Sequence, residues 1–121
     1  MEPFSSELQK IEEFVDLSDR DMLEIGCGDG RLSSLLAKKV RNLTAIDPDK
    51  AMINLARRDI NGVDFRVGHG ESLEFNDKSY DIIVFSYSLH HQDCVKALDE
   101  AKRVLRDKGI ILIIEPSTDG E

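Results

Sequence analysis

Residues 23–30 read Leu23-Glu24-Ile25-Gly26-Cys27-Gly28-Asp29-Gly30, an apolar strand end that runs into three glycines at alternate positions. Glycine permits a tight turn and lets a ligand approach the backbone without meeting a side chain. The stretch therefore predicts a nucleotide-like ligand at the carboxyl end of a β-strand. Two phosphate-binding loops fit less well, because Arg31 stands where a dinucleotide loop has its third glycine and no Gly-Lys-Ser/Thr follows. A glycine-rich turn without a ligand is the alternative.

Outward from this stretch, the apolar pattern alternates between strand and helix. We expect strands at residues 21–25, 43–46, 63–67, 80–85 and 110–114. We expect helices from Ser5 or Ser6 onward and at residues 31–40, 49–60 and 95–105. Such alternation implies right-handed crossovers and a mainly parallel sheet with helices on both faces, an α/β three-layer sandwich. The length fits one domain, residues 1–121, with residues 1–18 as an N-terminal helix and lead-in.

Two acidic residues are expected near the glycines in the fold, one before them in the sequence and one at the end of the next strand. Asp47 ends the expected second strand about twenty residues further on, where a carboxylate accepts both hydroxyls of a ribose. A turn aspartate that caps the next helix is the alternative, and both roles are compatible. Glu24 faces the same crevice, where it favours a cationic ligand or holds the loop by accepting backbone N–H bonds.

Five motifs in this order resemble class I S-adenosylmethionine-dependent methyltransferases of the small-molecule type, over about nine-tenths of the chain. They are residues 23–30, Ala45-Ile46-Asp47-Pro48, Gly68-His69-Gly70-Glu71-Ser72-Leu73, residues 80–86 with Leu89-His90-His91, and Arg103-Val104-Leu105 through Gly109 to Glu115-Pro116. The resemblance implies a Rossmann-like fold, S-adenosylmethionine as cofactor and S-adenosylhomocysteine as product.

The resemblance also implies which residues bind the cofactor. The glycine loop would hold its methionine part, Asp47 its ribose, and Met52 would lie against the adenine unless it is plain core. His69 stands where the family usually has an aspartate, and an imidazole accepts the adenine amino group more weakly. Gly70 would offer its backbone N–H to the ring. The full expected set is Glu24, Gly26, Cys27, Gly28, Gly30, Asp47, Pro48, Met52, His69, Gly70 and Ser86.

His90 and His91 raise the question of a metal or a catalytic base. No cysteine or histidine at ligand spacing accompanies them, so we predict no metal site. We expect them near the substrate opening, where they are proximity candidates for a base; the alternative is a helix start capped by Asp93. Direct methyl transfer depends mostly on alignment and exclusion of water, so no catalytic residue is assigned. Neither Cys27 nor Cys94 has a neighbouring base that would make it a nucleophile.

Composition narrows the partners. The formal net charge of −8 disfavours nucleic acid and favours a small-molecule acceptor. No apolar run reaches the roughly 20 residues of a membrane span. Residues 1–10 lack the features of a secretion signal, and two distant cysteines fit a reducing compartment, so we expect a cytoplasmic protein.

The chain stops at Glu121, whereas members of the resembled family continue through another helix and an antiparallel hairpin. The strand from Ile110 to Ile114 would then lie at an open apolar edge. We expect that edge to be paired in a homodimer, covered by a partner chain, or exposed in a fragment. The predicted function is methyl transfer to a small molecule. A non-catalytic S-adenosylmethionine-binding module or subunit that needs a partner chain is the alternative, and Arg31 disfavours a nicotinamide-dependent oxidoreductase.

Overall fold

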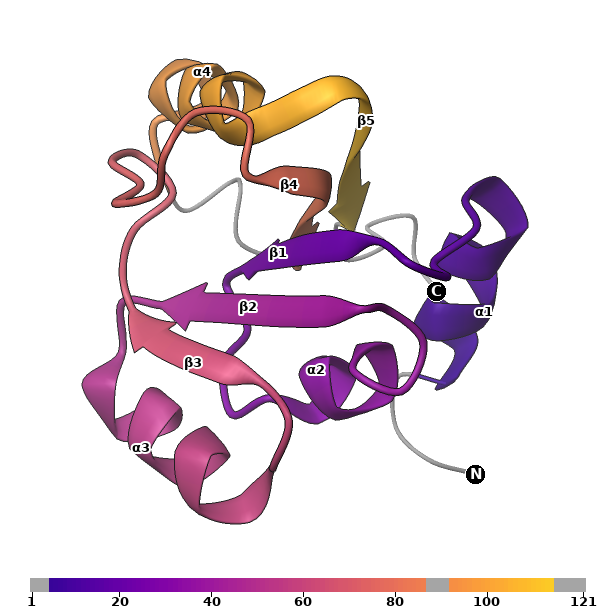
Figure 1. The fold of residues 1–121 in the computed structure, drawn as a ribbon. Helices are drawn as coiled ribbons and strands as arrows, with labels where there is room; N and C mark the ends of the chain where they lie inside the picture. Colours follow the sequence, from indigo (N-terminus) through magenta and orange to yellow (C-terminus); the bar gives the residue numbers. More distant parts are fainter. Residues whose placement is uncertain (1–4, 87–91, 115–121) are drawn as a thin grey trace, which may run out of the picture.

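Five strands form one sheet in the order β3-β2-β1-β4-β5, and every neighbouring pair is parallel (Figure 1). The computed structural model describes residues 5–86 and 92–114. Its elements are α1 (Ser5–Phe14), β1 (Asp21–Ile25), α2 (Arg31–Leu36), β2 (Asn42–Asp47), α3 (Lys50–Asp59), β3 (Asp64–Val67), β4 (Tyr80–Ser86), α4 (Cys94–Val104) and β5 (Leu105–Ile114). The predicted α/β fold with a mainly parallel sheet is confirmed.

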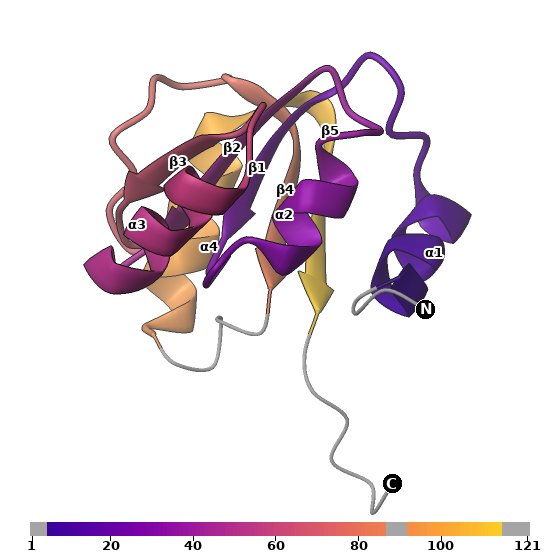
Figure 2. The ribbon, with the colours of Figure 1, turned by 90° about the horizontal axis from the view of Figure 1, so that it is seen from below.

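Helices cover both faces of the sheet, as Figure 2 shows with α2 and α3 on one side and α4 on the other. The alternation of side chains along β1 explains this layering. Leu23 and Ile25 pack in one cluster with Ala97, Ala101 and Val104 of α4. Met22 faces the other way and packs with residues of α1 and α2. The three-layer sandwich is therefore confirmed.

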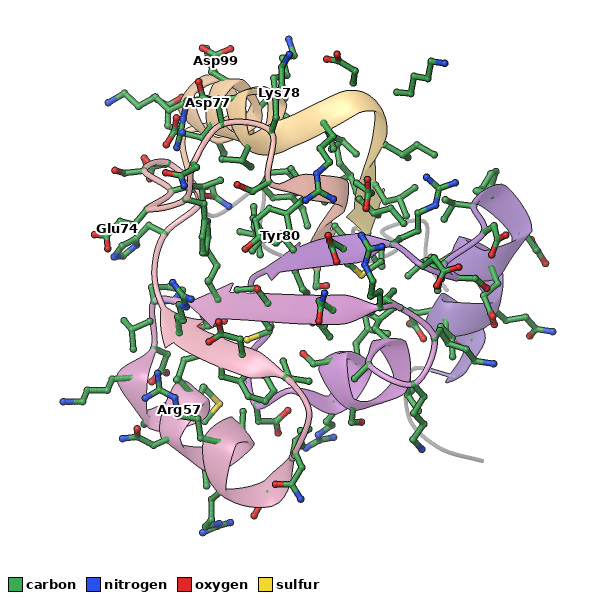
Figure 3. The ribbon with its side chains drawn as sticks, viewed as in Figure 1. Arg57, Glu74, Asp77, Lys78, Tyr80 and Asp99 are labelled. Atoms are coloured by element: carbon green, nitrogen blue, oxygen red, sulfur yellow. The ribbon has the colours of Figure 1, made fainter. Side chains whose placement is uncertain are left out.

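The third helix is fixed at both ends by polar contacts. The Asp49 carboxylate accepts hydrogen bonds from the backbone N–H groups of Ala51 and Met52, so it is the cap of α3. Near the other end, the Arg57 guanidinium donates two hydrogen bonds to the Phe65 carbonyl, at 3.0 and 2.7 Å (Figure 3). These bonds hold α3 against β3. Gly62, with a φ of 83°, makes a left-handed turn between them.

Two expected boundaries are wrong. The second helix ends at Leu36 rather than at residue 40, because the backbone tightens into i→i+3 hydrogen bonds from Lys38 and Lys39. The fifth strand begins at Leu105 rather than at Ile110. Its polar segment turns, with Lys108 at a φ of 67°, and β4 pairs with Leu105 before this segment and with Ile110 after it, across a register shift. The strand was therefore expected to begin after this irregularity, although its first pair lies before it.

No helix in residues 5–86 and 92–114 has both the length and the apolar character needed to cross a membrane.

Candidate functional site

The glycine-rich segment forms a bend tied to the end of the neighbouring strand. Gly26, Gly28 and Gly30 have φ values of 87°, 57° and 88°, a left-handed region that favours glycine. The backbone N–H groups of Gly26 and Cys27 both donate to the Ile46 carbonyl, at 2.8 and 3.1 Å. These bonds fix the bend across the carboxyl ends of β1 and β2.

The Asp47 carboxylate lies at this bend. The Gly28 backbone N–H donates to Asp47 Oδ2 at 2.9 Å, and the Asp49 backbone N–H donates to Asp47 Oδ1 at 2.9 Å. A carboxylate has about four acceptor positions, so two bonds leave capacity for the hydroxyls of a ligand. The acid and the bend therefore converge, as the sequence predicts. The capping role that was the alternative for Asp47 belongs to Asp49.

The last two glycines of the bend, Gly28 and Gly30, face different surroundings. A methyl group on Gly28 would meet no atom within 4 Å, so this side of the bend is open to a ligand. A methyl group on Gly30 would lie 2.7 Å from Ile60 Cδ1 and 2.9 Å from Phe65 Cζ. Gly30 is thus required by the packing of the bend on α3 and β3, whereas Gly28 leaves space for a ligand.

A cavity of about 260 Å³ opens beside the bend. It brings together five residues expected from the sequence with three that were not expected. The expected ones are Glu24, Gly26, Cys27, Gly28 and Ser86, and the additional ones are Asp29, Arg31 and Leu32. The carboxyl ends of β1 and β4 thus share one hollow, because these strands are neighbours in the sheet.

Glu24 is fully buried at the base of this cavity. Its two carboxylate oxygens accept hydrogen bonds from the hydroxyls of Ser33, at 2.5 Å, and Ser86, at 2.8 Å. Burial raises the pKa of Glu24, although the two hydroxyl bonds oppose the rise. Sequence reasoning missed Ser33. The signal was its place three residues before Leu36, on the buried face of α2.

Cys27 also lines the cavity but is chemically quiet. Its side chain is buried among Ala45, Ile53 and Phe65. Burial, with smaller contributions from nearby carboxylates, raises the pKa of the Cys27 thiol, so the reactive thiolate does not form at neutral pH. Nucleophilic chemistry is therefore not expected of Cys27.

The remaining predicted residues lie around the bend, not all in its cavity. Met52 is half-buried in the first turn of α3, and Pro48 is exposed beside Asp47. His69 is exposed and borders a second hollow of about 280 Å³ that also contacts Ile46 and Phe75. His69 is therefore not a lining residue of the cavity beside the glycines.

Gly70 is buried between two side chains. A methyl group there would lie 2.5 Å from Gln92 Oε1 and 3.2 Å from Ile25 Cγ2. No motif or spacing in the sequence points to the contact with Gln92. His90 and His91 lie outside the described residues. Within residues 5–86 and 92–114, no three His, Cys, Asp or Glu side chains gather closely enough to hold a metal ion.

Comparison with known proteins identifies the family that carries this site. A family model described as "Methyltransferase domain" matches residues 23–113. The chain belongs to the class I S-adenosylmethionine-dependent methyltransferases. The matched range includes the bend, Asp47 and the fold around them.

Individual members of this methyltransferase family support the assignment. The chain is 35% identical over 99 residues to the "Probable S-adenosylmethionine-dependent methyltransferase" of Mycolicibacterium smegmatis, covering 81% of this chain and 38% of the relative. It is 32% identical over 115 residues to ribosomal RNA small subunit methyltransferase A of Mycoplasma mobile, covering 84% and 45%. The crystal structure of YcgJ from Bacillus subtilis superposes with a TM-score of 0.80 at 31% identity, covering 88% and 48%. The chain thus spans less than half the length of each of these proteins.

The residues at the site fit the cofactor of the methyltransferase family. The bend offers backbone with no side chain in the way, since the Gly28 side is open. One strand over, Asp47 keeps acceptor capacity for ribose hydroxyls. The cavity of about 260 Å³ connects the bend to Ser86 at the end of β4.

Proposed function

We propose that this chain binds S-adenosylmethionine at the carboxyl ends of β1, β2 and β4, and that it transfers the methyl group to a small-molecule acceptor. The observation that carries the proposal is the 2.9 Å hydrogen bond from the Gly28 backbone to Asp47. It brings a ribose-binding acid and a side-chain-free bend to one point, which is the arrangement that an adenosyl group needs.

In this proposal each part of the cofactor has its own residues. The backbone from Gly26 to Gly30 would hold the methionine part beside Glu24 and Ser86, and Asp47 would bind the ribose hydroxyls. The adenine side would be bordered by a set spread over three segments, namely Pro48, Met52, His69 and Gly70. When bound, the cofactor supplies an activated sulfonium methyl group. The chain itself aligns the reactants and excludes water, which together lower a barrier by roughly 7–11 kcal/mol in well-oriented systems.

Electrostatics favours a small acceptor over nucleic acid. The formal net charge is −8, which repels a phosphate backbone. Many cationic side chains are also neutralised by carboxylates. Ion pairs join Arg31 to Asp29, Arg41 to Asp21, Arg58 to Asp59, Arg66 to Asp64 and Arg103 to Asp77. One relative is named as a ribosomal RNA methyltransferase. The acidic charge of this chain nevertheless favours a small-molecule acceptor over RNA.

Three further expectations belong to the proposal. We place His90 and His91 beside the acceptor, because they follow β4, whose end borders the cavity. We place the protein in the cytoplasm, because Cys27 and Cys94 are not joined in a disulfide. We also propose that the edge of β5 is paired in a homodimer or covered by a partner chain, because β5 is an apolar edge strand of the sheet formed by the described residues.

Calorimetric titration tests the cofactor site. We expect S-adenosylmethionine and S-adenosylhomocysteine to bind the wild type. Asp47→Ala should lower the affinity for both by about 10- to 100-fold, because it removes charge-assisted hydrogen bonds to the ribose. Asp49→Ala is the matched control, because it removes the neighbouring carboxylate, which caps α3. Binding of NAD alone would overturn the assignment.

Turnover separates catalysis from mere binding. Transfer of a radiolabelled methyl group to one of a panel of small acceptors would support the enzyme. Tight binding of both adenosyl compounds with no transfer to any acceptor would favour the non-catalytic module that serves a partner chain.

A further inference from the structure

The segment that follows β3 crosses the ends of two other strands. A methyl group on Gly68 would lie 3.5 Å from Ile46 Cδ1 in β2, and one on Gly70 would lie 3.2 Å from Ile25 Cγ2 in β1. Both isoleucines are buried members of the core cluster on the α4 face of the sheet. The segment carries His69 and Gly70, which border the adenine in the proposed function.

This segment has little regular structure of its own. Among the backbone hydrogen bonds that the structure gives for residues 68–77, one joins two residues of the segment itself. It runs from the Ser72 N–H to the His69 carbonyl at 3.3 Å. Leu73 is buried in the core cluster that includes α4. The position of the segment is therefore set by what it contacts.

Arg103 of α4 binds the segment at three points. Its Nη1 donates to the Phe75 carbonyl and to Asp77 Oδ1, both at 2.8 Å. Its Nη2 donates to the Leu73 carbonyl at 2.8 Å. Figure 3 shows Asp77 lying beside α4. A planar guanidinium presents its donors in a fixed fork, so these bonds fix direction as well as distance.

Glu100 completes the contact from one turn earlier in α4. Its Oε2 accepts from Arg103 Nε at 2.8 Å, and its Oε1 accepts from the Leu73 backbone N–H at 2.7 Å. The bond from Arg103 lowers the pKa of the Glu100 carboxyl, which keeps it charged at neutral pH. Leu73 therefore has both its N–H and its carbonyl bound by this one ion pair.

We propose that Glu100 and Arg103 are positioning residues that set the place of residues 68–77 and thereby the recognition of the adenine base. The inference rests on the proposed function, since it takes His69 and Gly70 to be the adenine border. The pair does not touch the cofactor in this scheme. It acts through the backbone of Leu73 and Phe75, four to six residues beyond His69.

The test compares two ligands that differ only in the base. S-Adenosylhomocysteine and S-inosylhomocysteine are titrated into the 121-residue wild type, Arg103→Lys and Glu100→Gln. Arg103→Lys keeps the charge but loses the fork, and Glu100→Gln keeps the shape but loses the charge. We expect each variant to lower the affinity for S-adenosylhomocysteine by about tenfold and to change the affinity for S-inosylhomocysteine much less. The preference for adenine over hypoxanthine therefore falls.

Arg106→Lys is the matched control. Arg106 makes its ion pairs with Asp21 and Asp81, whose strands begin at the opposite end of the sheet. We expect this variant to lower the melting temperature without changing either dissociation constant. If Glu100 and Arg103 have a purely structural role, their variants will also lower the melting temperature and leave the preference for adenine unchanged. That result would overturn the inference.

The outcomes separate this inference from the proposed function. If the wild type binds neither adenosyl compound, the proposed function fails and this inference fails with it. If the wild type binds and Asp47→Ala does not, but both positioning variants keep the wild-type preference for adenine, only the inference is overturned.

Discussion

Gly28 and Gly30 adopt similar left-handed backbone conformations, but only Gly30 is enclosed by side chains. An alanine at either position carries backbone strain of about 1 kcal/mol. At Gly30 the added methyl group also collides with Ile60 and Phe65, and overpacking of this kind costs about 1–3 kcal/mol more.

We therefore predict that Gly30→Ala lowers the free energy of unfolding by about 2–4 kcal/mol and Gly28→Ala by about 1 kcal/mol. Urea denaturation measures both. The main effect of Gly28→Ala should be a lower affinity for S-adenosylhomocysteine, because its methyl group enters the open side of the bend. Equal losses of stability in the two variants would contradict the different packing described above.

At the scale of elements, an ion cluster ties together the starts of three strands. Asp21 of β1 accepts from Arg41 and from Arg106 of β5, with distances of 2.9 and 2.8 Å. Arg106 also reaches Asp81 of β4, at 3.1 Å. β1 and β5 lie on either side of β4, and each of them is joined to β4 by backbone pairing. Hydrogen bonding from Arg41, ahead of that from Arg106, lowers the pKa of Asp21.

A lowered pKa gives a definite sign to the pH dependence. The folded Asp21 resists protonation more than the unfolded one, so its stabilisation is complete above the ordinary aspartate pKa of 3.8 and fades as the pH falls below it. We predict that Asp21→Asn costs about 1–2 kcal/mol at pH 7, allowing for solvent screening of the exposed Arg41. The cost should shrink as the pH falls from 4 to 2. Urea denaturation across that range checks this, and a constant cost would refute it.

Strand and helix periods predicted the elements well where one pattern ran without interruption. β1 begins and ends at the expected residues, because its apolar run is bounded by Asp21 and the glycines. The expected β5 was too short, because Asp107 and Lys108 look like a loop and hide the pair that Leu105, before them, makes with Tyr80 of β4. Local composition does not reveal pairing with a strand more than twenty residues away.

The same limit applies to the site. The contact of Asp47 with the bend could be predicted, because neighbouring parallel strands end at the same edge of a sheet. The helix period places Ser33 on the buried face of α2, but it does not show that Ser33 donates a hydrogen bond to Glu24. The bonds from Arg103 to Leu73 and Phe75 span 30 and 28 residues, and no spacing rule connects them.

At the scale of the whole molecule, β5 is the last strand of the described sheet. Ile110 and Ile113 are 38% and 48% exposed, which is unusual for apolar residues beside unpaired backbone. We predict that the 121-residue chain self-associates, and that Ile113→Lys shifts it toward the monomer by placing a charge at the edge. Light scattering over a range of concentrations measures this. A clean monomer at every concentration would exclude pairing between copies at this edge.

The central place of β1 also governs the order in which the chain can assemble during synthesis. Leu23 pairs with Thr44 on one side but with Ile83 on the other, 60 residues later. At about 5–20 residues per second, a ribosome needs roughly 3–12 s to supply that second neighbour. Through that interval Glu24 already has Ser33 at hand but lacks Ser86. The crevice is therefore closed only after β4 has been made, and one side of β1 has no neighbouring strand until then.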